Sequence, residues 1–273
     1  MRVKLLKSRA ASAAENMALD EALLDYVTED GSAALPWLRS YSWERTTVSF
    51  GYFQRPEREI DLSRARDLGL ELVKRPTGGK ALIHGDELTY SVVLPAACKL
   101  CKLSVAESHQ ILAKALVKAL TRFDLSAELS KPALARRASR DGRIPCFAEH
   151  LAESVVIDGR KVAGSAQLRR KGALLQHGSI VRSMDAKLHD ELFASAAKGL
   201  EKRASGLDSF LEVLPSLDEL ADTVLESLLE ALEAVVVEKV ETLPPWVETR
   251  KNRLVAEKYA RLDGSIRQEE KSI

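Results

Sequence analysis

Hydrophobic and polar positions along the chain repeat with two different periods, and the change of period predicts where helices and strands lie. Apolar residues recur every three to four positions after Ser12 and again after Ser104, which predicts two amphipathic helices. Glu15 and Glu107 stand three residues beyond these serines, and each Ser–Glu pair is a capping box that marks a helix start. Helical spacing returns over residues 62–68, 217–237 and 246–262.

Strand-like segments fill most of the remaining chain up to residue 181. Segments rich in β-branched and aromatic residues favour strands over 36–53, 70–74, 81–83, 88–94, 154–157, 160–167 and 173–181. Asp158-Gly159 joins two of them and is typical of a two-residue hairpin, because a type I′ turn needs positive φ at both central positions. The pattern predicts an α+β fold with a central mixed, mostly antiparallel sheet flanked by helices.

Charge and composition exclude several classes of protein. The 273 residues include 41 Lys and Arg against 40 Asp and Glu, a net charge of +1, which argues against a nucleic-acid coat. No apolar run approaches the roughly 20 residues of a membrane span. Three cysteines cannot build a disulfide framework and favour a reducing compartment. The capping box at Ser12 indicates folded protein near the start, so we expect a cytoplasmic protein without membrane or nucleic-acid partners.

Four segments carry candidate chemistry, and each also has a purely structural interpretation. The glycine pair within residues 75–80 could admit a ligand, or form an ordinary turn. Cys146, which follows a basic stretch at 131–143, could be a nucleophile or a buried thiol. Lys161 should share a strand face with Ala163 and Ser165, and it could be functional or simply exposed. His177 interrupts an apolar strand and could be functional or structural.

Two cysteines stand apart from these segments. Cys98 and Cys101 have the spacing of a redox or zinc pair, but neither a second cysteine pair nor clustered histidines supply further ligands. We interpret them as an incidental pair in a loop.

Six segments occur in an order that resembles the lipoate–protein ligase and octanoyltransferase superfamily: residues 16–22, 49–54, 74–84, 87–92, 159–167 and 176–180. The chain looks most like octanoyltransferases of the LipM type, because Pro145-Cys146-Phe147 precedes the Gly-x-Lys-Val-x-Gly-Ser-Ala-Gln strand. It departs from the family pattern twice. Lys74-Arg75 replaces Arg-Arg, and His84-Gly85 replaces His-Asp, which puts in doubt the role of the aspartate.

The resemblance implies a biotin/lipoate protein ligase-like catalytic domain over residues 1–243 and a charged C-terminal helix and tail over 244–273, with no accessory domain. It implies a monomer that moves octanoate from octanoyl-acyl carrier protein to a lysine of a lipoyl-domain protein. The acceptor would be the glycine cleavage H protein or a dehydrogenase E2 lipoyl domain. The reaction would need no metal and no cofactor.

The resemblance also implies roles for single residues. Cys146 would carry the acyl thioester, and Lys161 would favour its thiolate form and position the acyl carbonyl. The acyl pocket would be lined by Arg75, Thr77, Gly78, Gly79, His84, Gly164, Ser165, Ala166, His177 and Gly178. The stretch 131–143 would attract the acidic carrier protein or be a solvated loop.

Three other functions fit the same motifs. A lipoyl or octanoyl amidotransferase would use the same thiol but take its acyl group from another lipoyl domain. An ATP-dependent lipoate ligase would set Lys161 against an α-phosphate. A non-enzymatic acyl- or biotin-binding module would not need Cys146.

Overall fold

The chain folds around one large sheet, as a computed structural model describes for residues 1–30, 34–130, 154–193 and 199–260. Its strands are β1 (Arg2–Lys7), β2 (Trp37–Tyr41), β6 (Glu87–Leu94), β7 (Ala127–Leu129), β8 (Val155–Ile157), β9 (Arg160–Arg170), β10 (Ala173–Val181) and β11 (Val236–Lys239). They lie in the order β11-β1-β2-β6-β10-β9-β8-β7. Only the β11–β1 and β1–β2 pairs are parallel, so the predicted mixed, mostly antiparallel sheet is confirmed.

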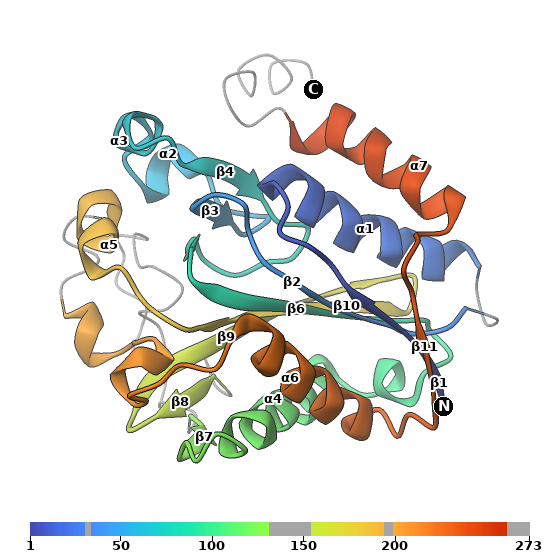
Figure 1. Cartoon of the computed structure of the whole chain (residues 1–273). Coiled ribbons are helices and arrows are strands. Elements are labelled where there is room, and N and C mark those ends of the chain that lie inside the picture. Colours follow the sequence, from blue (N-terminus) through green and yellow to red (C-terminus); the bar gives the residue numbers. More distant parts are fainter. Residues whose placement is uncertain (31–33, 131–153, 194–198, 261–273) are drawn as a thin grey trace.

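Helices cover both faces of this sheet (Figure 1). One face carries α1 (Ala13–Glu29) and α7 (Pro245–Leu254), and the other carries α4 (Val105–Thr121) and α6 (Leu217–Ala231). The predicted capping boxes at Ser12 and Ser104 are present, and Ser216 caps α6 in the same way. Each face therefore has its own apolar core, with the sheet between them.

A second, three-stranded sheet lies beside the α1 face of the large one (Figure 1). Its central strand β3 (Thr47–Phe50) pairs with β4 (Glu71–Lys74) in parallel and with β5 (Leu82–His84) in antiparallel fashion. The short helices α2 (Pro56–Glu59), α3 (Leu62–Asp67) and α5 (Ala186–Phe193) accompany it. The predicted glycine segment leads from β4 to β5.

The predicted hairpin turn is confirmed. Asp158 and Gly159 have φ of 49° and 71°, as a type I′ turn between β8 and β9 requires. Lys171 and Gly172, at 48° and 81°, make the same kind of turn between β9 and β10.

One expectation near the C-terminal end is wrong. The helix predicted over 217–237 stops at Ala231, since Glu233 adopts a φ of 52° that ends the helical path. The β-branched residues that follow form β11, which pairs with the unpredicted strand β1. The helix predicted over 246–262 is α7 and a π-helical turn, Val255–Tyr259, and its last two residues lie outside the described part.

The C-terminal helix packs along α1. Arg250 lies 2.8 Å from the Asp25 carboxylate, and Lys258 lies 2.6 Å from that of Glu21. The division at residue 243 stays a prediction. Short 3₁₀ turns complete the described chain at Lys99–Lys102, Leu200–Lys202 and Leu207–Ser209.

Candidate active site

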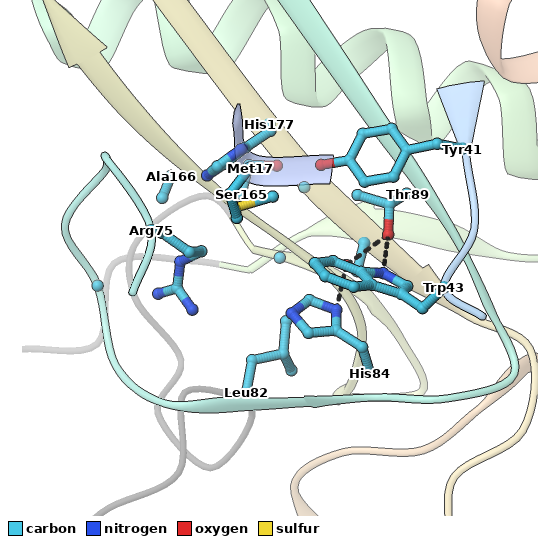
Figure 2. A pocket seen from close by; sticks show the side chains of 14 residues that line it. Met17, Tyr41, Trp43, Arg75, Leu82, His84, Thr89, Ser165, Ala166 and His177 are labelled. Atoms are coloured by element: carbon cyan, nitrogen blue, oxygen red, sulfur yellow. Dashed lines mark hydrogen bonds between the residues drawn. The ribbon is translucent and has the colours of Figure 1, made fainter. Parts of the chain in front are cut away.

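A cavity opens between the two sheets, and fourteen residues line it (Figure 2). They are Met17, Tyr41, Trp43, Arg75, Gly79, Leu82, His84, Thr89, Gly164, Ser165, Ala166, His177, Gly178 and Ser179. Its enclosed volume is about 50 Å³, and its empty space is about 510 Å³ when the mouth open to solvent is included. Eight of the ten residues predicted to bind the acyl group line this cavity.

The glycine loop packs directly against the end of β3. A Cβ on Gly51 would lie 2.0 Å from the Gly79 carbonyl oxygen, so this approach needs glycine. Gly79 itself has a φ of +96°, a conformation that strongly favours glycine. The Arg75 guanidinium donates to the carbonyls of Ser49, Gly78 and Lys80 at 2.9, 3.2 and 2.9 Å. Arg75 therefore holds the loop as well as lining the cavity, and Gly78 contributes its carbonyl to this bracing.

A buried relay joins α1, β10 and the loop. The Asp20 carboxylate lies 3.0 Å from His177 Nδ1, and His177 Nε2 lies 2.7 Å from Thr77 Oγ1. A carboxylate only accepts, so Nδ1 carries the proton and Nε2 accepts from the Thr77 hydroxyl. Thr77 is thus not on the cavity wall but fixes the loop to His177 from behind.

Charge within this relay is set by burial and by Arg39. Burial opposes ionisation of Asp20, but the Arg39 guanidinium at 2.8 Å and His177 outweigh it, and the pKa of Asp20 lies below its usual value. Burial lowers the pKa of His177, and the Asp20 carboxylate only partly offsets this. His177 is therefore neutral at pH 7, as its acceptor role toward Thr77 requires.

A second relay holds the opposite wall. The Glu87 carboxylate accepts from His84 Nδ1 at 2.6 Å, and His84 Nε2 lies 2.5 Å from Ser49 Oγ. The hydroxyl of Ser49 also accepts from Arg75 at 2.6 Å, so this relay ends on the glycine loop too. Figure 2 shows the Trp43 ring stacked on His84, with ring centroids 4.0 Å apart.

The departure from the family's His-Asp pattern has a structural answer. Asp86 pairs with Arg182 at 2.5 Å. The buried carboxylate beside His84 is Glu87, which also accepts from Ser179 at 2.7 Å. In this chain Glu87 therefore holds the histidine.

Lys161 is buried beside the cavity, but not on the face that alternation predicts. Val155 pairs with Ala163 and Val156 with Lys161, so β9 carries one extra residue there, a β-bulge. A Cβ on Gly164 would lie 3.1 Å from Lys161 Nζ. Lys161 thus shares a face with Gly164, and the prediction that it shares one with Ala163 and Ser165 is wrong.

The cysteines divide into two groups. Cys146 and the basic stretch 131–143 lie outside the described residues. Burial raises the pKa of Cys98 and of Cys101 to about 11, so both are thiols at pH 7 and poor nucleophiles. Within the described ranges, no group of His, Cys, Asp and Glu could hold a metal ion. Over the same residues, no helix is both long and apolar enough to cross a membrane.

Sequence reasoning missed six residues of the cavity wall: Met17, Tyr41, Trp43, Leu82, Thr89 and Ser179. Four of the six, Met17, Leu82, Thr89 and Ser179, fall within segments that carry the family resemblance, and membership of those segments was the available signal. Trp43 carried none. Its indole N–H donates to Thr89 Oγ1 at 2.9 Å.

Comparison with known proteins identifies the family. The profile of the lipoyl protein ligase A/B catalytic domain matches residues 12–229 of the chain. The chain belongs to this family. Octanoyltransferase LipM of Macrococcus caseolyticus (strain JCSC5402) is 38% identical over 210 residues, which is 76% of this chain and 75% of that protein. Octanoyltransferase LipM of Geobacillus kaustophilus (strain HTA426) is 33% identical over 258 residues, which is 90% of this chain and 89% of that protein.

Solved structures of the lipoyl protein ligase family share the fold. A bipartite lipoate protein ligase from Thermoplasma acidophilum, studied with its E2 lipoyl domain, superposes with a TM-score of 0.76 at 24% identity. That similarity covers 95% of this chain and 94% of the other. The structure of lipoate-protein ligase A bound with ATP superposes with a TM-score of 0.71 at 23% identity, and the similarity covers 95% of each chain. The expected biotin/lipoate ligase-like fold is thereby confirmed.

Proposed function

We propose that this chain moves an octanoyl group from octanoyl-acyl carrier protein to a lysine of a lipoyl-domain protein through a thioester on Cys146. That it is an acyltransferase of lipoate biosynthesis follows from its family and its LipM relatives. The carrier protein as donor, the H protein or an E2 lipoyl domain as acceptor, and the residue roles are the proposal.

The observation that carries the proposal is the chemical character of the cavity. Its histidines and hydroxyls are hydrogen-bonded to buried partners such as Thr77, Glu87 and Tyr90, and most of its surface is apolar. Such a wall suits an alkyl chain, whose burial is worth about 0.8 kcal/mol per CH₂. Met17, Leu82 and the Trp43 ring are among the apolar groups that line it.

The reaction has two balanced steps. The Cys146 thiolate attacks the octanoyl thioester, its new C–S bond forms, and the carrier's pantetheine thiolate leaves. The neutral amine of the acceptor lysine then attacks the enzyme thioester. The amide C–N bond forms, the C–S bond to Cys146 breaks, and the proton of the amine passes to solvent.

Lys161 supports both steps. Its ammonium lies at Gly164 on the cavity wall, where a positive charge favours a thiolate and stabilises the oxyanion of a tetrahedral intermediate. The other predicted residues shape the acyl pocket, with Arg75 and Thr77 holding the glycine loop in place.

Transfer to an unmodified lipoyl domain tests this function with three donors in parallel. We expect octanoyl-acyl carrier protein to modify the lipoyl domain without ATP. If only an octanoylated lipoyl domain serves as donor, the chain is an amidotransferase. If only octanoate with ATP serves, it is a ligase, and the proposal fails in either case.

A further inference from the structure

Two aromatic side chains project into solvent immediately after β3. Tyr52 is 51% exposed and Phe53 is 88% exposed, and their rings meet edge to face with centroids 5.0 Å apart. Among the large apolar side chains of the described residues, none is more exposed than Phe53. Paired exposed aromatics next to a functional site are typical of an interaction surface.

This aromatic pair is attached to the rim of the cavity. The Tyr52 N–H donates to the Thr77 carbonyl oxygen at 2.8 Å. Gly51, the preceding residue, packs against Gly79, which lines the cavity. A partner bound on Tyr52 and Phe53 would therefore lie within reach of the cavity mouth.

Positive charge accompanies the aromatic pair. Lys74 Nζ lies 5.7 Å from the centre of the Tyr52 ring, and Arg55 is exposed two residues beyond Phe53. Asp86 and Asp185 instead line a second cavity, which shares Leu82 with the first. The donor and the acceptor of the proposed transferase differ in charge near the reacting group. The donor brings a negatively charged phosphodiester-linked arm, and the acceptor brings a lysine ammonium.

We propose that Tyr52, Phe53, Arg55 and Lys74 form a docking surface, here named the aromatic rim, for the carrier of the acyl group. Its occupant is a protein that presents acidic side chains and a phosphodiester-linked thioester arm. Cations at the rim attract that charge, and the two aromatic rings supply apolar contact area. This inference rests on the proposed function, since it assumes a carrier protein as donor.

Loading of the chain by two donors tests the aromatic rim. Octanoyl-acyl carrier protein needs a docking surface, whereas octanoyl-pantetheine lacks both protein and phosphate and needs only the cavity. In Phe53→Ser and Lys74→Glu we expect the KM for the carrier-bound donor to rise roughly tenfold or more, as for an interface anchor. Loading from octanoyl-pantetheine, and discharge of the loaded enzyme to a lipoyl domain, should stay unchanged.

Val213→Ser is the matched control, because Val213 is 84% exposed and lies outside the aromatic rim and the cavity. Unchanged carrier loading in Phe53→Ser would overturn the inference. So would an equal loss with octanoyl-pantetheine, or a loss confined to discharge, which would make the rim an acceptor surface. Failure of the unaltered chain to load from the carrier would refute the proposed function instead, so the two failures are distinct.

Discussion

Replacing Gly164 by alanine should separate the position of the Lys161 ammonium from the stability of the fold. The new Cβ would lie 2.9 Å from Lys161 Cε and 3.1 Å from Nζ. Carbon atoms in contact normally lie about 3.5–4.0 Å apart, so the end of the lysine must move by roughly 0.6–1 Å. The contacted atoms belong to the far end of the lysine side chain and not to the backbone, so β9 itself need not move.

The structure sets the expected change in rate and the expected change in stability for Gly164→Ala. Displacement of a catalytic group by about 1 Å can cost roughly 100-fold in rate, so we expect acyl-enzyme formation to slow about 10- to 100-fold. Alanine within a strand loses less backbone entropy on folding than glycine, a gain of about 0.5–1 kcal/mol. The melting temperature of Gly164→Ala should therefore equal or slightly exceed that of the unaltered chain.

The assay combines acyl-enzyme formation, followed as intact mass over time, with thermal unfolding of the same samples. Gly85→Ala is the control, because a Cβ on Gly85 meets nothing within 4 Å. We expect this variant to load at the normal rate. Normal loading by a folded Gly164→Ala would refute the role given to Lys161, and a large loss of stability would refute the geometric reasoning.

Three further predictions concern the two relays and the buried histidines. Thr77→Val should lower the free energy of unfolding in urea by about 1–3 kcal/mol and weaken acyl binding, because it leaves the buried His177 Nε2 without its hydrogen-bond donor. An unchanged unfolding midpoint would contradict the hydrogen bond between Thr77 and His177. Glu87→Gln should lower the free energy of unfolding by about 2–3 kcal/mol, and Asp86→Asn should lower it by roughly 0–1 kcal/mol. Equal effects would contradict the assignment of Glu87 as the partner of His84. Burial lowers the pKa of His177 and His189, so below 6.5 the unfolded chain binds protons that the folded chain does not. The free energy of unfolding should then fall with falling pH, by up to about 1.4 kcal/mol per unit for each histidine, and a flat profile from pH 7 to 5.5 would be inconsistent with neutral buried rings.

Elements with strong local signals were predictable. The capping serines fixed where α1 and α4 begin, and Asp158-Gly159 fixed a hairpin, because each signal acts within four residues. The strands β1 and β11 escaped prediction, and they pair with each other across more than 200 residues of chain. Such pairing leaves little trace in local periodicity.

The candidate site was predictable as a set of residues, but not as a geometry. Motif order placed His177 and Gly79 near one ligand, and both line the cavity. The partnership of Asp20 with His177 joins residues 157 positions apart and depends on how α1 packs on the sheet. The Lys161 face was wrong because one extra residue in β9 reverses strict alternation, and nothing in the hydrophobic pattern marks that bulge.

The intact mass of the purified chain after mixing with octanoyl-acyl carrier protein, without ATP, tests the central claim most directly. We predict a gain of one octanoyl group that is absent in Cys146→Ala. The gain should persist when Cys98 and Cys101 are both replaced by alanine, since burial raises the pKa of each to about 11. Addition of an unmodified lipoyl domain should then discharge the adduct. No adduct on the unaltered chain, or an undiminished adduct on Cys146→Ala, would contradict transfer through a Cys146 thioester.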